Sequence, residues 1–128
     1  MRLLLTAILL TILLSCSKEA APLVIPPATE GGWKLVSSTP VDVSRKPDWM
    51  QRLGLKTAMT ARYAGPMDVE ADIYELRSDA AALECTQLWK RSPGDSPFIK
   101  RNLFIVIRSS HPNREMMMDF SRALEKAL

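Results

Sequence analysis

The sequence predicts an α+β domain in which two or three helices pack on one face of a small, mainly antiparallel sheet. Alternating apolar residues flank a Gly-Pro turn between positions 57 and 76, as in a hairpin. A short, continuous apolar run follows at 103–107, and an amphipathic helical pattern closes the chain. The length of 128 residues, with 47% hydrophobic and 24% charged side chains, fits one globular domain and excludes a disordered chain.

The predicted domain spans Trp33–Leu128 and opens with a strand at Trp33–Ser37. The segment Ser44–Leu55 is expected to form a short helix. Pro47 suits the first turn of that helix and Gly54 suits its end. No internal repeat is present in this part of the chain.

The hairpin is predicted to pair Thr57–Ala64 with Val69–Leu76. Both apolar sets share one face only if the loop holds an odd number of residues. A five-residue loop, Ala64–Asp68, meets that condition and places Arg62 opposite Glu70 on the solvated face. The residues expected to face inward are Met59, Ala61, Tyr63, Val69, Ala71 and Ile73.

The second half of the domain is predicted as a helix at Ser78–Arg91, a loop at Ser92–Pro97, a strand at Lys100–Ser109 and a helix at Asn113–Leu128. The apolar run Leu103–Ile107 is typical of a central strand with cover on both sides. The first helix is expected to bury one stripe, composed of Ala81, Ala82, Cys85, Leu88 and Trp89.

The N-terminus has the pattern of an export signal. Arg2 precedes the apolar run Leu3–Leu14, which is about 18 Å long as a helix and too short for a bilayer core of about 30 Å. The sequence Leu13-Leu14-Ser15-Cys16 that follows resembles the lipobox of bacterial lipoproteins. An uncleaved membrane helix, or an ordinary secretory signal with a chance cysteine, is the alternative.

The lipobox resemblance implies that residues 1–15 are removed and that Cys16 carries a diacylglycerol on its sulfur. Two or three acyl chains hold a protein at a membrane where one does not, since each buried CH₂ contributes about 0.8 kcal/mol. The expected location is therefore a cell membrane. In lipoproteins of Gram-negative bacteria, serine at position 17 is compatible with sorting to the outer membrane, facing the periplasm.

The segment between the predicted anchor and the domain, residues 16–32, is expected to be a flexible tether. Its three prolines and closing Gly-Gly disfavour a continuous helix or strand. Docking of Leu23-Val24-Ile25 on the domain as an edge strand is the alternative.

Part of the domain is similar to an uncharacterised family of bacterial exported proteins. The similarity lies in the Tyr63-Ala64-Gly65-Pro66 turn, the Val69–Tyr74 strand and the alanine-rich helix after it. It implies export and no particular activity.

Cys85 and His111 are the residues that a thiol-dependent enzyme would use. Cys85 lies in the predicted apolar stripe, where a thiol is inert, and no glycine-rich turn flanks either residue. Core packing for Cys85 and an exposed loop position for His111 are therefore favoured over catalysis.

Methionines and acidic residues give two weaker candidates. Successive residues of a helix point 100° apart, so Met116, Met117 and Met118 cannot converge on one Cu(I) ion; Met118 is instead a candidate partner contact. Glu70 and Asp72 share a strand face and could act as paired carboxylates, but a solvated strand face explains them better. The sequence predicts no cofactor and no metal site.

These observations predict a lipid-anchored cell-envelope protein, not an enzyme, that binds a protein or peptide partner. An envelope carrier of an apolar small molecule is the first alternative, with a pocket lined by Trp49, Trp89 and methionines. The thiol-dependent enzyme is the second. The formal net charge of +3 is too small to indicate nucleic-acid binding, and the oligomeric state is not predicted.

Overall fold

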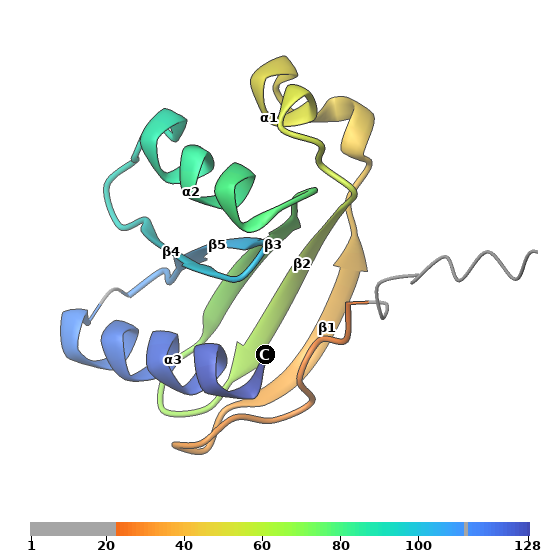
Figure 1. The fold of residues 1–128 in the computed structure, drawn as a ribbon. Coiled ribbons are helices and arrows are strands. Elements are labelled where there is room, and N and C mark those ends of the chain that lie inside the picture. The colour runs from red at the N-terminus through yellow and green to blue at the C-terminus, as the bar shows by residue number, and fades with distance from the viewer. Residues whose placement is uncertain (1–22, 112) are drawn as a thin grey trace, which may run out of the picture.

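The protein is a small α+β domain built on one antiparallel sheet, as the sequence predicts (Figure 1). The computed structural model describes residues 23–111 and 113–128. The sheet order is β1-β2-β3-β5-β4. Its strands are β1 (Lys34–Pro40), β2 (Thr57–Ala64), β3 (Val69–Glu75), β4 (Ser96–Lys100) and β5 (Leu103–Arg108). The helices are the 3-10 turn η1 (Val43–Arg45), α1 (Asp48–Arg52), α2 (Asp79–Leu88) and α3 (Arg114–Ala127).

The helices cover both faces of the sheet, so the expectation that they pack on one face is wrong. Alternate side chains of β5 point to opposite faces: Ile105 packs in one core with α3, and Phe104 in the other core with α1 and α2. The apolar run of β5 required this arrangement, because a strand that is hydrophobic on both sides needs two layers of cover.

The β2–β3 hairpin has the predicted register. Tyr63 pairs with Val69 and closes the five-residue loop Ala64–Asp68. Arg62 lies opposite Glu70, and the two side chains form an exposed ion pair with an N–O distance of 3.4 Å. Alternation and loop parity were therefore sufficient to fix this part of the sheet.

Strand β4 replaces part of the loop predicted at Ser92–Pro97, and the strand predicted at Lys100–Ser109 begins at Leu103. The two strands form a tight hairpin whose turn places Arg101 in the left-handed region, with φ of 54°. Pro97 is compatible with β4 because this strand lies at the edge of the sheet.

The helices begin and end close to the predicted positions. The Ser78 side chain accepts a hydrogen bond from the Ala81 amide and caps α2, and Asn113 caps α3 in the same way. Helix α2 ends at Leu88, which is exposed instead of contributing to the buried stripe. At Trp89, the C-cap of α2, the backbone is already extended.

Residues 23–32 lie against the domain, where the sequence predicted a tether. The carbonyl oxygen of Pro26 accepts a hydrogen bond from the Tyr63 hydroxyl at 2.8 Å, and that of Pro27 accepts one from the Leu35 amide at 2.9 Å. Leu23 and Ile25 pack on the core beneath α3. The alternative, docking on the domain, thus describes residues 23–32 better than a tether does. These residues form one isolated bridge with β1 and not the edge strand that the alternative included. Cys16 and the rest of the predicted signal and tether lie outside the described residues.

Candidate interaction site

On the sheet face against which α2 packs, the helices leave part of the sheet uncovered, and we call this part the bare face. Helix α2 contacts β4 and β5, whereas β1 and the adjoining halves of β2 and β3 carry polar side chains on this face. The register places these side chains opposite one another, pair by pair: Ser37, Thr39, Thr60, Arg62, Glu70 and Asp72. This face is the region of the sheet where the chain keeps polar groups accessible.

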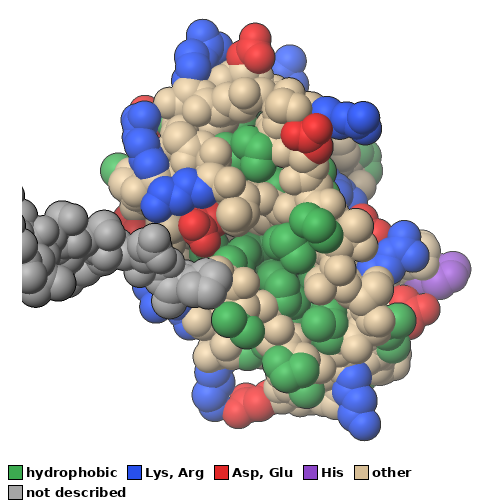
Figure 2. Space-filling model, turned by 90° about the vertical axis from the view of Figure 1, so that its right-hand side faces the viewer, with side chains coloured by type: hydrophobic (Ala, Val, Ile, Leu, Met, Phe, Trp, Pro, Cys, Tyr) green, Lys and Arg blue, Asp and Glu red, His purple; other side chains and the backbone are tan. Residues whose placement is uncertain are grey.

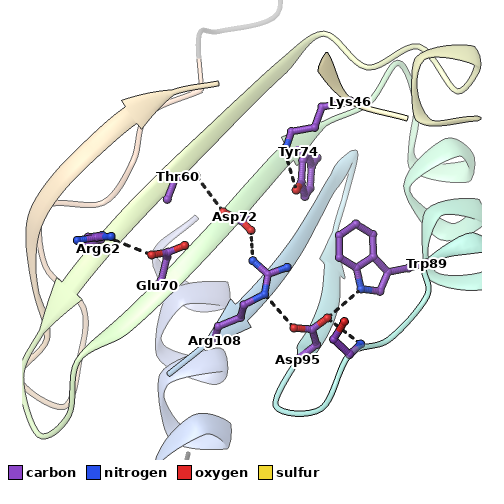
Figure 3. A network of polar contacts seen from close by, with 10 residues as sticks. Lys46, Thr60, Arg62, Glu70, Asp72, Tyr74, Trp89, Asp95 and Arg108 are labelled. Atoms are coloured by element: carbon purple, nitrogen blue, oxygen red, sulfur yellow. Dashed lines mark hydrogen bonds and ion pairs between the residues drawn. The ribbon is translucent and has the colours of Figure 1, made fainter. Parts of the chain in front are cut away.

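Arg108 joins the bare face to the loop that precedes β4 (Figure 3). Its Nε donates to Asp95 Oδ1 at 2.9 Å, and its Nη1 donates to Asp72 Oδ2. Asp72 Oδ1 accepts a further hydrogen bond, from the Thr60 hydroxyl at 2.9 Å. One guanidinium thus connects β5, β3 and the loop between α2 and β4.

Asp95 is the most buried charged group described, with its side chain 3% exposed. Its Oδ2 accepts hydrogen bonds from the Ser92 amide at 3.0 Å and the Trp89 indole at 3.4 Å. Burial alone would raise the pKa of Asp95, but the hydrogen bonds from Ser92 and Arg108 outweigh it and hold that pKa below its ordinary value. Asp95 is therefore ionised at neutral pH and fixes the loop.

A depression of about 700 Å³ opens at the end of the bare face nearest the β2–β3 turn. Val36, at a β-bulge of the edge strand β1, projects beside it and is 67% exposed. The depression is lined by Val36, Arg62, Tyr63, Ala64, Asp68, Val69, Glu70, Arg108, Ser109 and Ser110. We call this surface the Val36–Arg62 site.

The two carboxylates of the strand face do not form a pair with each other. Glu70 pairs with Arg62, whereas Asp72 pairs with Arg108, so the two carboxylates bind different arginines. The prediction of a solvated strand face holds for Glu70 and is wrong for Asp72, whose side chain is 13% exposed. Acid–base work by the pair is not supported, because each carboxylate is already neutralised by its own cation.

Sequence reasoning missed Asp95 and Arg108 as a linked pair, because it placed Asp95 in the loop at Ser92–Pro97 and Arg108 in the strand at Lys100–Ser109. The register of β3 with β5 sets Arg108 opposite Glu70, which is two residues from Asp72 and on the same face. That pairing joins segments more than thirty residues apart, so no local pattern could reveal it. The only sequence signal was a charged residue at the end of an otherwise apolar strand.

The Cys85–His111 pair does not form a catalytic site. Cys85 is 0% exposed in the core beneath α2, and burial, together with the charge of Glu84, raises the pKa of its thiol to about 11. His111 is exposed in the loop after β5. A protonated, inaccessible thiol is not a nucleophile at neutral pH.

Most of the methionines and tryptophans predicted as candidate contacts pack against the two cores. Met117 is buried under α3, Met116 is half-buried and Met118 is exposed, so the three sulfurs do not share a site. Trp89 packs against Phe104 and Tyr74, with ring centroids 5.4 and 6.2 Å apart, and Trp49 packs against the same core. Among residues 23–111 and 113–128, no group of three or more His, Cys, Asp or Glu side chains is placed to hold a metal ion.

No protein-family model, curated protein or solved structure matches the chain. In the described part of the chain, no helix combines the length and the hydropathy that a membrane crossing requires.

Proposed function

We propose that the protein is a lipid-anchored cell-envelope module that binds an extended segment of a partner protein at the Val36–Arg62 site. The anchor rests on Cys16 and the lipobox that precedes it. The observation that carries the binding role is the bare, polar half of a sheet whose other parts are covered by helices on both faces.

The edge strand β1 supplies the backbone for such an interaction. It lies at the end of the sheet order, and the docked N-terminal segment reaches only its first residues, through the Ala28–Lys34 bridge. Beyond Leu35, the strand has no other strand of the described chain on its outer side. An extended peptide can add to an exposed edge of this kind through main-chain hydrogen bonds.

Side chains at the site set the chemistry of the partner. Val36 offers an apolar contact, and Arg62 is the more exposed member of its ion pair, with 68% of its side chain exposed against 37% for Glu70. The guanidinium of Arg62 is therefore open to a second carboxylate, which can bind it in a bidentate manner. The partner segment is expected to carry an apolar side chain beside an acidic one.

Metabolic labelling with palmitate tests the anchor. Wild-type protein should incorporate the label, whereas Cys16→Ser should not and should accumulate with residues 1–15 attached. Cys85 serves as an internal control, since Cys85→Ala should be labelled like the wild type. Equal labelling of wild type and Cys16→Ser would remove the anchor from the proposal.

Site-specific photocrosslinking in the native envelope tests the surface. A photoreactive residue at Val36 should give a discrete adduct with one protein, and Arg62→Glu should reduce that adduct at least tenfold. The matched control is Arg45→Glu, an exposed arginine of η1 whose reversal should leave the adduct unchanged. A crosslinked partner segment without an acidic residue, or an adduct insensitive to Arg62→Glu, would contradict the proposed site.

A further inference from the structure

A second groove opens where the described chain begins, at the other end of β3 from the Val36–Arg62 site. It has a volume of about 610 Å³ and lies between the docked N-terminal segment, the C-terminal end of α3 and the β4–β5 turn. Its lining includes Leu23, Val24, Glu75, Arg101 and Leu128. We call it the N-terminal groove.

The length of chain between Cys16 and this groove is short. Leu23, the first described residue, already packs against the core. Seven peptide units separate it from Cys16, and seven extended residues span at most about 25 Å. A tether that ran to Gly32 would have reached about twice as far. A lipid on Cys16 therefore keeps the N-terminal groove within about 25 Å of the bilayer surface.

The side chains at the groove have the character of a membrane interface. Val24 is 71% exposed, the highest value among the five large hydrophobic side chains that stand out on the described surface. Arg101 extends from the β4–β5 turn beside it and donates a hydrogen bond from Nη2 to the Leu128 carbonyl oxygen at 2.8 Å. An exposed aliphatic side chain next to an arginine suits the headgroup region of a bilayer. The aliphatic side chain can contact the acyl boundary, and the arginine can pair with the lipid phosphates.

Figure 2 shows this side of the molecule. Hydrophobic side chains gather in a band beside the start of the described chain, and both basic and acidic side chains stand around its margin. The apolar band can meet the acyl boundary of a bilayer, and the Lys and Arg side chains near it can pair with the headgroups of anionic lipid.

We infer that the N-terminal groove is the face that lies against the membrane, with Val24 and Arg101 in the lipid headgroup region. This inference rests on the proposed lipid anchor. It fixes the orientation of the domain, because the two ends of β3 lie at the two surfaces. Glu75 lines the N-terminal groove, and Val69 lines the Val36–Arg62 site. At about 3.4 Å per residue, the interaction site then stands about 20 Å from the groove and faces away from the bilayer.

Depth-dependent quenching tests the orientation. The lipidated protein is reconstituted in vesicles of phosphatidylethanolamine and phosphatidylglycerol, 3:1, that contain headgroup-spin-labelled lipid. A fluorophore on Val24→Cys should be quenched at least threefold more than one on Leu83→Cys, an exposed position of α2 on the opposite face of the sheet. Both positions are exposed, and the buried Cys85 is protected from the label, so each variant carries one probe.

A third probe at Val36 and a flotation assay separate the outcomes. The fluorophore on Val36→Cys should be quenched no more than the one on Leu83→Cys. Protein that floats with the vesicles but is quenched equally at positions 24, 36 and 83 would overturn the orientation and leave the anchor intact. Protein that does not float would overturn the anchor, and the orientation with it.

Discussion

Replacement of Arg108 by methionine is expected to destabilise the domain much more than the same replacement at Arg62. Both arginines pair with carboxylates, but the partners of Arg108 are the buried Asp95 and the largely covered Asp72, whereas Arg62 pairs with the accessible Glu70. Breaking a buried pair costs about 3–5 kcal/mol, and breaking an exposed pair costs about 0.2–1 kcal/mol. Because the Arg108 side chain is itself 38% exposed, we expect about 2 kcal/mol for Arg108→Met.

Urea unfolding followed by circular dichroism measures this difference at pH 7. A loss of about 2 kcal/mol corresponds to a fall in Tm of roughly 10 °C for a domain of this size. The pKa of Asp95 is lowered in the folded protein, so its contribution to stability is present above the unfolded pKa and is lost as the pH falls through the folded value. The difference in the free energy of unfolding between wild type and Arg108→Met should therefore become smaller below about pH 4. Equal destabilisation by the two variants, or a difference independent of pH, would refute the role of Asp95.

Three further outcomes follow from the two cores and the buried ionisable groups. Phe120→Ala should cost about 3–5 kcal/mol in urea unfolding, because the Phe120 ring packs 5.2 Å from the rings of both Trp33 and Tyr63; a loss below 1 kcal/mol would contradict that packing. The Cys85 thiol should not react with a thiol reagent at pH 8 until urea unfolds the protein, and rapid reaction in the native state would show that it is accessible. Burial raises the pKa of Tyr63 and Tyr74 to about 12, so absorbance titration should show no phenolate near pH 10. The stability that these two groups contribute below pH 10 should be lost as the pH rises through 12.

The β2–β3 hairpin shows what local patterns can predict. Alternation assigned the inward residues, and the odd loop length assigned the pairing of Arg62 with Glu70, because both follow from the two-residue period of a strand. The same reasoning failed for β4. Ser96 and Pro97 belong to a turn by composition, and they form a strand only because β5 offers its edge to them.

The predicted arrangement of helices failed where two local indications disagreed. The apolar run Leu103–Ile107 required cover on both faces, whereas the order of helices and strands suggested cover on one. The burial of a central strand is the stronger constraint, because an uncovered apolar face costs about 25 cal/mol for each Å² left in water. Docking of the segment at Leu23 was predicted only as an alternative, and the Arg108 network was not predicted, because each depends on contacts between distant parts of the chain.

Arg108 connects the stability of the domain to the shape of the interaction site, and this limits how binding can be tested. It lines the depression, but two of its nitrogens are committed to Asp72 and Asp95. A partner carboxylate that bound Arg108 would break its ion pairs with Asp72 and Asp95, whose side chains are largely covered. We therefore expect Arg62, and not Arg108, to determine which partner binds. Charge reversal at Arg62 therefore separates recognition from folding, whereas a change at Arg108 alters both at once.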